Sequence, residues 1–403
     1  MLVVGGGAAG LMAAFQAAAR GRRTVLLEKN QRPGLKILIS GGGRCNLTTT
    51  REGPDLEAQY GKRRGRFLRH ALRSFPPAAL RAFIEDAGVP LREEDLEKLF
   101  PVSQKAKDVV DALLRRCLDV GVQLVREAPA SEVALGGERF VVATPRGRFT
   151  APSVVLATGG LSYPRTGATG DGYAWCRAFG HTITATFPAL APLRVDEAWV
   201  HDLQGIVLDG VDIACLGADG KETLRRRRPI LFTHKGLSGP APMDLAGDVE
   251  EQRGAAQARF DFAPESHREQ LEQEWLAAAK EHGARRVDSL LPRRLPERMR
   301  AALVAASGAS AETTLAGLPK AARRRLLEAV KDLRVPAKES LGYGAAEVTR
   351  GGVALTEVDA KTMESKLQPG LFLCGELLDI DGPIGGFNFQ AAFATGRLAG
   401  LEA

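Results

Sequence analysis

The chain has 403 residues, of which 44% are hydrophobic and 26% are charged. This is ordinary globular composition, and the length suffices for two or three packed units. It argues against a membrane protein, because no apolar run approaches the roughly 18 residues that a span needs. The chain enters a strand and a turn without a basic segment followed by an apolar one, so we expect no secretory signal.

The five cysteines stand far apart and form no CxxC pair. Scattered thiols are typical of a reducing compartment, where most serve as small core residues, so we expect a cytoplasmic protein. The six histidines are equally dispersed and lack a companion carboxylate at helical spacing, and the sequence indicates no metal site. The cysteines are Cys45, Cys117, Cys176, Cys215 and Cys374.

The formal net charge is +7, and the excess of Lys and Arg is clustered. Two interpretations stay open. The clusters are solvated surface, or they form a face that binds a polyanion such as ribosomal RNA, because arginine pairs bidentately with phosphates. The clusters are Lys62–Arg64 with Arg66, Arg69 and Arg73, the run Arg225–Arg228, and the run Arg323–Arg325.

A complete dinucleotide-binding pattern opens the chain. The apolar run Met1–Val4 predicts a buried parallel strand, an Ala-rich helix follows, and TVLLEK predicts a second strand that ends at Glu28. The first strand is so short that the sequence leaves open whether Met1 is the true start. Between strand and helix stands the GxGxxG motif with its inner alanines: Gly5, Gly7, Ala8, Ala9 and Gly10.

Each part of this pattern has a physical task. Gly5 permits a tight turn, Gly7 lets the backbone approach a pyrophosphate, and Gly10 lets helix and strand pack closely. The helix N-terminus offers N–H groups to the phosphates. Glu28 is expected to accept hydrogen bonds from ribose hydroxyls, and the neighbouring Lys29 is a further candidate contact.

A second glycine cluster, ISGGGRCN at 39–46, has no strand, helix and acid of its own. We therefore interpret it as a facing wall of the first site and not as a second nucleotide site. Cys45 is a candidate redox thiol, although a packing role is favoured because no second cysteine stands at CxxC spacing. The cofactor contacts expected here are Lys36, Gly42, Gly43, Arg44 at the pyrophosphate, and Asn46 at flavin or ribityl atoms.

Apolar strands between 122 and 160 return the chain to the dinucleotide. They include Val133 and end in ATGG, where Thr158 and Gly159 are candidate contacts. No second GxGxxG with a following acid occurs later, which favours a flavin over a nicotinamide as the bound cofactor. Tyr163 either borders the flavin or packs in the core, and Asp171 is expected to cap the helix that follows it.

The pattern of expected strands and helices changes along the chain and predicts three domains. Strands alternate with helices over 1–187, as in an α/β sheet. Short strands with turns over 188–262 predict a β-barrel-like domain, to which we add 335–355. Residues 263–334 predict a helical subdomain, and 356–403 complete the first domain. The expected fold class is α/β: a Rossmann-like two-segment FAD-binding domain with these two inserts.

The segment LFTHKGLSGPAP at 231–242 carries the best candidate for a proton donor, His234, because the unperturbed pKa of imidazole lies nearest neutrality. Lys235 and Ser238 are also placed to face a substrate. An equally weighted alternative is a capped turn that begins a helix with Ser238 as its N-cap.

The C-terminal segment predicts a strand over 370–374, a loop, and a helix from about Asn388. A helix N-terminus aimed at a flavin stabilises negative charge on the reduced ring. Glu376 is expected to accept from ribityl hydroxyls, and the glycines let the backbone lie against the ring. The candidate contacts are Gly375, Glu376, Gly385, Gly386, Phe387 and Asn388.

These segments together resemble the BaiN/RdsA-type flavoproteins, also described as aminoacetone oxidase-like FAD-binding enzymes. The resemblance is spread over most of the chain and rests above all on KILISGGGRCN and GPIGGFNFQ, with GGGAAG, ATGG, TGDGY and LFTHKGLSGPA in support. It implies a two-part FAD domain with an inserted β-barrel and a small helical insert. It also implies redox chemistry linked to NAD(P)H or to the substrate.

Four functions follow as hypotheses. The first is an FAD-dependent oxidoreductase that transfers hydride from reduced flavin to an activated C=C bond, with NAD(P)H as a transient donor because no second dinucleotide domain is visible. The second narrows the substrate to uridine in ribosomal RNA, and the third is an oxidase of small amines. The fourth is a non-enzymatic, flavin-containing RNA-binding or assembly factor. The sequence leaves open the substrate, the choice of NADH or NADPH, and the oligomeric state.

Overall fold

The computed structural model describes all 403 residues, and the chain divides into two compact units. Unit 1 comprises Met1–Pro188 and Ala346–Ala403, and unit 2 comprises Ala189–Ala345. The sequence led us to expect that the insert ends at 355. Residues 346–355 instead belong to unit 1, because Thr184 and Gly352 exchange hydrogen bonds and Ile183 pairs with Val353.

Unit 1 is built on a five-stranded sheet in the order β22-β10-β1-β2-β6, and the pairings are all parallel. The strands β22, β10 and β1 are wholly buried, which explains why their sequences are continuous apolar runs and do not alternate. The strands are β1 (Leu2–Val4), β2 (Val25–Leu27), β6 (Gln123–Val125), β10 (Val154–Leu156) and β22 (Leu371–Leu373). The expected α/β, Rossmann-like fold class is confirmed.

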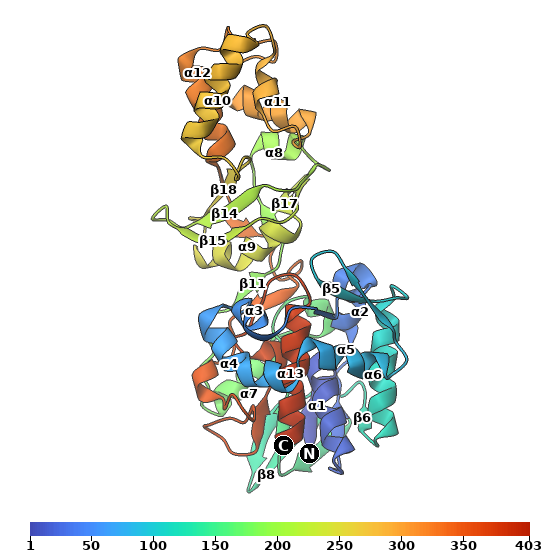
Figure 1. Cartoon of the computed structure of the whole chain (residues 1–403). Helices are drawn as coiled ribbons and strands as arrows, with labels where there is room; N and C mark the ends of the chain where they lie inside the picture. The colour runs from blue at the N-terminus through green and yellow to red at the C-terminus, as the bar shows by residue number, and fades with distance from the viewer. The chain divides into compact units, whose positions relative to one another are not determined.

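Two helices from opposite ends of the chain pack together on this sheet. Helix α1 (Ala8–Ala19) contacts β1, β2 and β10, and α13 (Phe387–Glu402) packs along α1 (Figure 1). A Cβ at Gly396 would lie 2.3 Å from the carbonyl oxygen of Ala9, and one at Gly400 would lie 2.3 Å from that of Ala13. The glycines therefore set how closely the helices approach.

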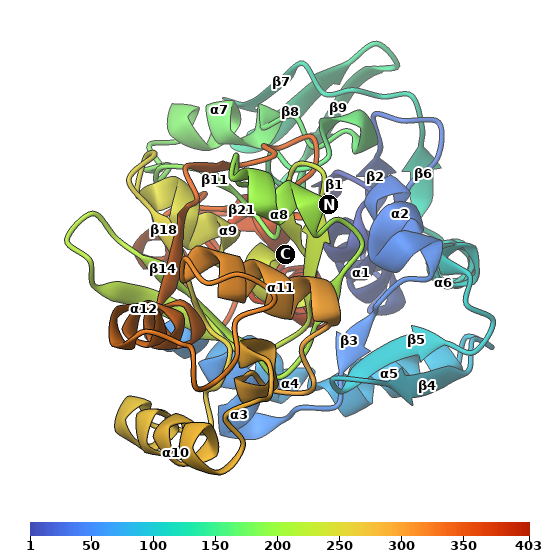
Figure 2. The same ribbon diagram turned by 90° about the horizontal axis from the view of Figure 1, so that it is seen from above.

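Further elements of unit 1 surround this centre. The strands β7, β8 and β9 form an antiparallel sheet, visible together in Figure 2, and β3, β5 and β4 form another. Their bounds are Glu132–Gly136, Arg139–Thr144 and Gly147–Ala151, then Thr48–Thr49, Lys98–Pro101 and Leu91–Glu94. The other helices are α2 (Leu35–Gly43), α3 (Gly53–Ala58), α4 (Gly61–Ser74), α5 (Pro77–Glu85), α6 (Ala106–Asp119) and α7 (Asp171–Ala178). A short strand, β21, spans Val348–Arg350.

Unit 2 contains two antiparallel sheets, in the orders β13-β16-β17-β12-β20 and β15-β14-β18-β19. The first comprises Val207–Leu208, Ile230–Thr233, Gly236–Ser238, Leu193–Arg194 and Glu339–Ser340. The second comprises Glu222–Arg226, Asp212–Leu216, Gln257–Asp261 and Leu333–Pro336. Stacked phenyl rings of Phe232, Phe260 and Phe262 fill its core.

The helices of unit 2 are α8 (Ala198–Asp202), α9 (Pro240–Glu251), α10 (Arg268–Glu281), α11 (Glu297–Ala306) and α12 (Lys320–Lys331). The last three fall within the stretch expected to be helical and lie together at one end of the unit (Figure 1). Helix α12 packs against β18 and β19. No helix of either unit combines the length and the apolarity that crossing a membrane requires.

Candidate cofactor site

The turn between β1 and α1 has no room for side chains at two of its glycines. Gly5 has φ +105°, and a Cβ there would lie 2.5 Å from the carbonyl oxygen of Ala157. A Cβ at Gly10 would lie 1.8 Å from the carbonyl oxygen of Gly5. These two glycines are therefore required by the protein's own packing.

Gly7 differs, because a Cβ there would meet no atom within 4 Å. Its backbone is extended, with φ −81° and ψ −170°, which any residue can adopt. Ala8 and Ala9 form the first turn of α1, where backbone N–H groups lack intrahelical acceptors. Open space in front of unpaired donors fits the pyrophosphate of a dinucleotide.

A second observation supports this fit at the end of β10. The hydroxyl oxygen of Thr158 is buried and has no hydrogen-bond partner within the protein. Buried hydroxyls are nearly always paired, so this atom indicates a missing polar neighbour. Gly159 follows with φ +73°. Thr158 lies at the carboxyl edge of the parallel sheet, where ligands of such folds bind.

Glu28 is buried at the end of β2 and fixes the glycine turn. One carboxylate oxygen accepts from Gly6 N–H at 2.7 Å, and the other accepts from the backbone and side-chain nitrogens of Asn30, each at 2.8 Å. Burial raises the pKa of Glu28, and the hydrogen bonds from Asn30 and Gly6 oppose that rise. Each carboxylate oxygen has two acceptor sites, so capacity for a ribose hydroxyl is left. That contact stays a prediction.

Lys29 lies against the turn that precedes α7. Its Nζ donates to Asp171 and Thr169, each at 2.7 Å, and to the carbonyl of Gly167 at 3.1 Å. A cofactor contact for Lys29 stays a prediction, and a cofactor would have to compete with these three partners for its ammonium group. The expectation that Asp171 caps α7 is wrong, because the N-cap is Gly170 and Asp171 is the first helical residue.

The ISGGGRCN segment forms the end of α2 and a left-handed turn. Gly41, Gly42 and Gly43 have φ values of +55°, +69° and +85°, which glycine adopts most easily. A Cβ at Gly42 would meet nothing within 4 Å. Arg44, expected at the pyrophosphate, donates to Glu94 and Gln104 at 2.9 Å each and lies 4.2 Å above the Phe100 ring. Its role as a cofactor contact stays a prediction.

Cys45 is fully buried, and burial raises the pKa of its thiol to about 12. A nucleophilic or redox thiol needs a lowered pKa and access to its reactant. The structure therefore argues against a catalytic Cys45 and supports the packing alternative. The other four cysteines are also free and buried, as the scattered spacing predicted.

The same segment is joined to the C-terminal glycine loop. With its amide oriented to satisfy both neighbours, Asn46 accepts from Gly386 N–H at 3.0 Å and donates to the carbonyl of Thr48 at 3.2 Å. A Cβ at Gly386 would lie 2.5 Å from the Thr48 backbone. The two segments predicted to line one site are thus in contact. Whether Asn46 also touches a flavin stays a prediction.

The loop before α13 is anchored by its own residues. Asn388 exchanges two hydrogen bonds of 2.9 Å with the backbone of Gly382. The Tyr60 hydroxyl donates to the carbonyl of Phe387 at 2.7 Å, and Phe387 is buried. Gly385 has φ +142° and lies against the Phe387 ring. Helix α13 begins at Phe387, one residue earlier than expected, and its N-terminus follows this loop.

A polar cluster joins four distant segments of unit 1. Lys36 Nζ lies 2.7 Å from Glu376 Oε2 and 2.7 Å from the Ser162 hydroxyl. Ser162 donates to the other oxygen of Glu376 at 2.6 Å, and Thr349 N–H donates to that oxygen at 3.0 Å. The two charged side chains, both singled out in the sequence, satisfy each other. A ribityl contact for Glu376 and a phosphate contact for Lys36 stay predictions.

Sequence patterns did not mark Ser162 or Thr349. The Thr349 hydroxyl accepts from the N–H groups of Leu161 and Ser162 at 2.8 and 3.1 Å. Ser162 lies two residues after ATGG, the segment that follows β10, and this position could have marked it as a candidate from the sequence. Thr349 carries none, because its place depends on pairing between segments 187 residues apart.

Three further expected contacts have these positions. Gly375 has φ +70°, and its N–H donates to the Thr395 hydroxyl at 3.0 Å. A Cβ added to Gly375 would lie 2.8 Å from the Cβ of Ala9. Val133 is buried in β7. Tyr163 is half-buried with φ +49°, and burial, then the Glu347 charge, raise the pKa of its phenol. No observation assigns Val133 or Tyr163 to the cofactor, and those contacts stay predictions.

His234 and Lys235 lie in unit 2, exposed in the turn between β16 and β17. A catalytic role for His234 stays a prediction. The alternative for Ser238 as an N-cap is wrong, because Ser238 ends β17 and the N-cap of α9 is Gly239. Gly239 has φ +87°, and its Cβ position is crowded by the backbone of Pro229 and Leu231, which explains the glycine.

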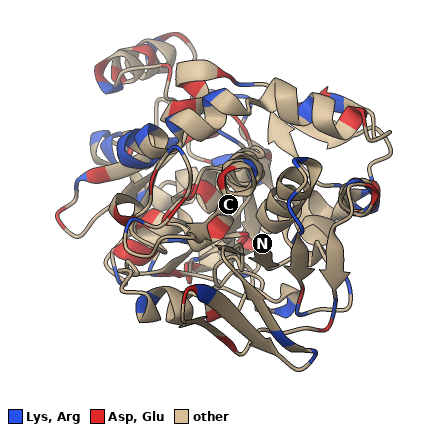
Figure 3. Ribbon diagram, turned by 90° about the horizontal axis from the view of Figure 1, so that it is seen from below, with Lys and Arg blue, Asp and Glu red and all other residues tan.

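The arginine clusters are partly neutralised by carboxylates within their own unit. Arg226 and Arg228 pair with Asp244, and Arg227 pairs with Asp212. Arg63 and Arg64 pair with Asp379. Figure 3 shows Lys and Arg interspersed with Asp and Glu over much of the chain. The polyanion interpretation therefore applies to individual faces and not to the whole surface.

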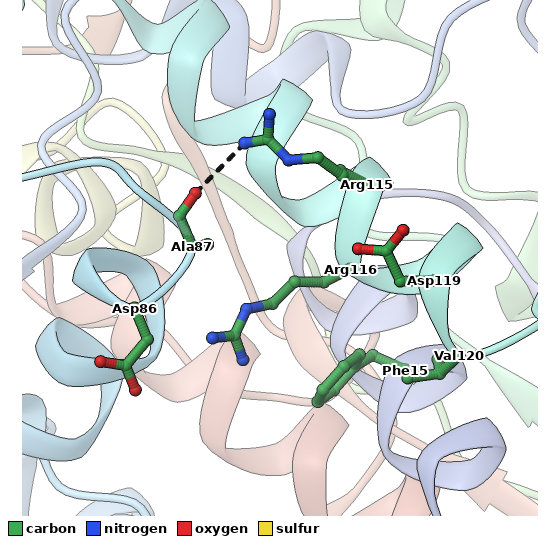
Figure 4. A pocket seen from close by; sticks show the side chains of 7 residues that line it. All are labelled: Phe15, Asp86, Ala87, Arg115, Arg116, Asp119 and Val120. Carbon is green, nitrogen blue, oxygen red and sulfur yellow. Dashed lines mark hydrogen bonds between the residues drawn. The ribbon is translucent and has the colours of Figure 1, made fainter.

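An open hollow of about 350 Å³ lies elsewhere in unit 1. Phe15 of α1 lines it with residues that follow α5 and residues at the end of α6 (Figure 4). Arg115 donates to the carbonyl of Ala87 at 3.1 Å, and Arg116 lies 4.2 Å above the Phe83 ring. The ends of these helices lie away from the carboxyl edge of the sheet, so the hollow is separate from the cofactor site.

A model of the HI0933-like protein Rossmann domain matches residues 1–402. The chain belongs to this family. The resemblance to BaiN/RdsA-type flavoproteins is confirmed, and the chain is an FAD-dependent oxidoreductase.

Two named members of the family are similar over almost their whole length. A ribosomal RNA dihydrouridine synthase of Escherichia coli is 31% identical over 98% of this chain and 95% of its own. A 3-dehydro-bile acid delta(4,6)-reductase of Clostridium scindens is 29% identical over 100% of this chain and 98% of its own. Among solved structures, the Mycobacterium smegmatis Sdh1 complex in the apo form matches with a TM-score of 0.50 at 17% identity. That likeness covers 100% of this chain and 67% of the other, and it shows the fold alone.

Proposed function

We propose that the protein is a reductase that saturates an activated C=C bond, and that its substrate is uridine in ribosomal RNA. The observation that carries the proposal is the similarity over nearly the whole chain to relatives named for two such reductions. Dihydrouridine is uridine with its 5,6 double bond saturated, and a delta(4,6)-reductase also acts on C=C bonds. The identities of 31% and 29% do not separate the two substrates, and the net charge of +7 is what favours the RNA over the steroid acid.

The residues at the carboxyl edge of the sheet would hold the cofactor. The open side of Gly7 and the first turn of α1 suit the pyrophosphate, and the unpartnered hydroxyl of Thr158 offers a polar contact. The N-terminus of α13 supplies positive partial charge beside the glycine loop. Bound FAD, once reduced by NAD(P)H, would supply the hydride for the electron-poor carbon of the C=C bond.

The protein would bind the electron donor NAD(P)H, supply a proton and give the uridine access to the flavin. We propose that NAD(P)H binds transiently, because the sequence holds no second fingerprint of the kind that opens the chain. His234 is the proposed proton donor to the neighbouring carbon. A uridine has to leave the base stack before it can reach a flavin, which is easiest in single-stranded or damaged segments. A ribosomal RNA substrate would place the protein in the cytoplasm.

Anaerobic spectroscopy on the FAD-loaded protein tests this function. We expect NADH or NADPH to bleach the flavin absorbance, and deproteinised ribosomal RNA to restore it while dihydrouridine appears in the RNA. Restoration by a 3-oxo-4,6-diene steroid acid and not by RNA would instead assign the steroid reduction. Bleaching by small amines without NAD(P)H, with peroxide formed in air, would assign an amine oxidase and contradict the proposal.

A further inference from the structure

Helix α4 presents an exposed row of positive charge. Lys62, Arg66, Arg69 and Arg73 recur at helical spacing and are exposed, and we call this row the α4 face. It extends from Lys62 to Arg73, a distance of about 16 Å along the helix axis. Helix α4 contains no acidic residue, and Arg63 and His70 are exposed beside the row.

The α4 face is only half neutralised. Arg69 and Arg73 each pair with Glu57 of α3, at 2.8 and 3.0 Å. Burial would raise the pKa of Glu57, but the hydrogen bonds from both arginines lower it. Lys62 and Arg66 have no carboxylate partner. Charge of this kind is available to an anion outside the protein.

The α4 face is built next to the candidate cofactor site. Arg64, on the inner side of the helix, donates to Asp379 at 3.0 Å and lies 2.9 Å from Asp381, just before the glycine loop. Helix α4 also packs against α13 (Figure 1). A long anion held on the α4 face would therefore lie beside the loop that leads to the flavin contacts.

The side chains of the α4 face favour a nucleic-acid backbone over a lipid surface as the bound anion. The apolar residues of α4, which include Phe67, Leu68 and Leu72, are buried, so the helix has no apolar face to insert into a lipid surface. Guanidinium groups pair bidentately with phosphates, and a row of them matches a chain of regularly spaced phosphates. We propose that the α4 face docks the phosphodiester backbone of the substrate RNA. This rests on the proposed function.

The test compares charge-reversed variants of the FAD-loaded full chain. Lys62→Glu with Arg66→Glu removes the two unpaired cations. Arg139→Glu with Arg148→Glu, exposed on β8 and β9, makes the same charge change elsewhere in unit 1. Affinity for deproteinised ribosomal RNA is measured by fluorescence anisotropy over a series of KCl concentrations. The flavin spectrum and content report whether each variant is folded.

We expect the α4 variant to bind about tenfold more weakly at 0.1 M salt, and its slope of log K against log salt to be shallower by about 1.5. The control should keep the wild-type slope. Equal slopes for the α4 variant and the wild type would overturn the docking face while leaving the RNA substrate intact. Absence of any salt-dependent RNA binding by the wild type would overturn both. Polyglutamate binding as tight as RNA binding, with the same loss in the α4 variant, would assign the face to an acidic protein.

If the charge-reversed protein loses its flavin, the neutral pair Lys62→Gln with Arg66→Gln replaces it. The expected decrease in slope is then about 1.5 as well, because the same two contacts are removed without added repulsion. An unchanged slope in that variant would also overturn the docking face.

Discussion

Lys36 and Glu376 are 340 positions apart in the chain, and their charged groups lie 2.7 Å from each other. Both side chains are mostly buried, with 23% and 17% of their area exposed. The pair joins α2 to the residues that follow β22, and Ser162 bonds to both partners. Two of the segments predicted to hold the cofactor are therefore fixed to each other by the protein alone.

Removal of one partner of this pair should destabilise unit 1. We expect Glu376→Gln to lower the free energy of unfolding by about 2 kcal/mol, because Lys36 then keeps a poorly solvated charge without a counter-ion. Urea unfolding of the apoprotein measures this. The double variant Lys36→Met with Glu376→Gln should recover part of the loss. If the two losses simply add, the pair contributes nothing as a unit.

Substitutions at two glycines of the N-terminal turn should have different effects, one on the stability of the apoprotein and the other on FAD affinity. Gly10→Ala places a methyl group against the Gly5 carbonyl and should destabilise the apoprotein by about 3 kcal/mol. Gly7→Ala adds a methyl group in open space, so we expect nearly unchanged apoprotein stability and FAD affinity lower by about tenfold or more. Unaltered FAD affinity in Gly7→Ala would show that the pyrophosphate does not approach Gly7.

Cys45 should act on stability at alkaline pH and not on turnover. Its pKa is raised from 9.0 to about 12, so above pH 9 the unfolded thiol loses a proton that the folded thiol keeps. This contribution is complete below pH 9 and is lost as the pH rises towards 12, by about 1.4 kcal/mol per pH unit. Cys45→Ala should therefore lose about 1 kcal/mol less than the wild type between pH 9 and 10, because the unfolded thiol is already half ionised at pH 9. Urea unfolding at the two pH values measures it, and a large fall in turnover would restore the catalytic hypothesis.

Two arginines of α4, Arg64 and Arg66, should contribute very differently to the free energy of unfolding. Arg64 pairs with the buried carboxylates of Asp379 and Asp381, whereas Arg66 is exposed without such a partner. We expect Arg64→Gln to lower the free energy of unfolding by about 3 kcal/mol, and Arg66→Gln to change it by less than about 0.5 kcal/mol. Thermal unfolding of the two variants tests this. Similar melting temperatures would mean that the buried carboxylates find other partners.

His234→Gln tests the proposed proton donor. We expect turnover to fall by about 10² to 10⁴ with FAD content unchanged, because general acid catalysis typically contributes that much. His282→Gln in the same unit is the matched control and should keep full turnover. Full activity in His234→Gln would remove this residue from the mechanism and leave the proton source to another group.

The local part of the fold was predictable, because it depends on short-range patterns. The glycine turn, the Ala-rich helix and the strand that ends at Glu28 follow one another within 28 residues, and periodicity with glycine spacing defines them. The helical stretch of unit 2 was found in the same way. Helix starts were less predictable: Asp171 and Ser238 looked like N-caps, but Gly170 and Gly239 hold those positions.

The interior of the candidate site was less predictable. Lys36 and Glu376 were marked as cofactor contacts by their places beside glycine motifs, but nothing local shows that they pair with each other. Thr349 and Asp379 are placed by contacts with residues far away in the chain, and such contacts cannot be predicted from a single sequence. The pairing of Arg44 with Glu94 could not be predicted either, because the two residues are 50 positions apart in the chain, and a pyrophosphate contact for Arg44 stays a prediction.

The close packing of Gly396 and Gly400 on α1 has a consequence for biosynthesis. The helix of the N-terminal fingerprint lacks its partner until almost the whole chain has left the ribosome, which at 5–20 residues per second takes roughly 20 to 80 s. During that time the apolar, small-residue side of α1 has to be shielded by other means. Flavin loading should therefore be a late event, and an arrested nascent chain that lacks α13 should not retain FAD.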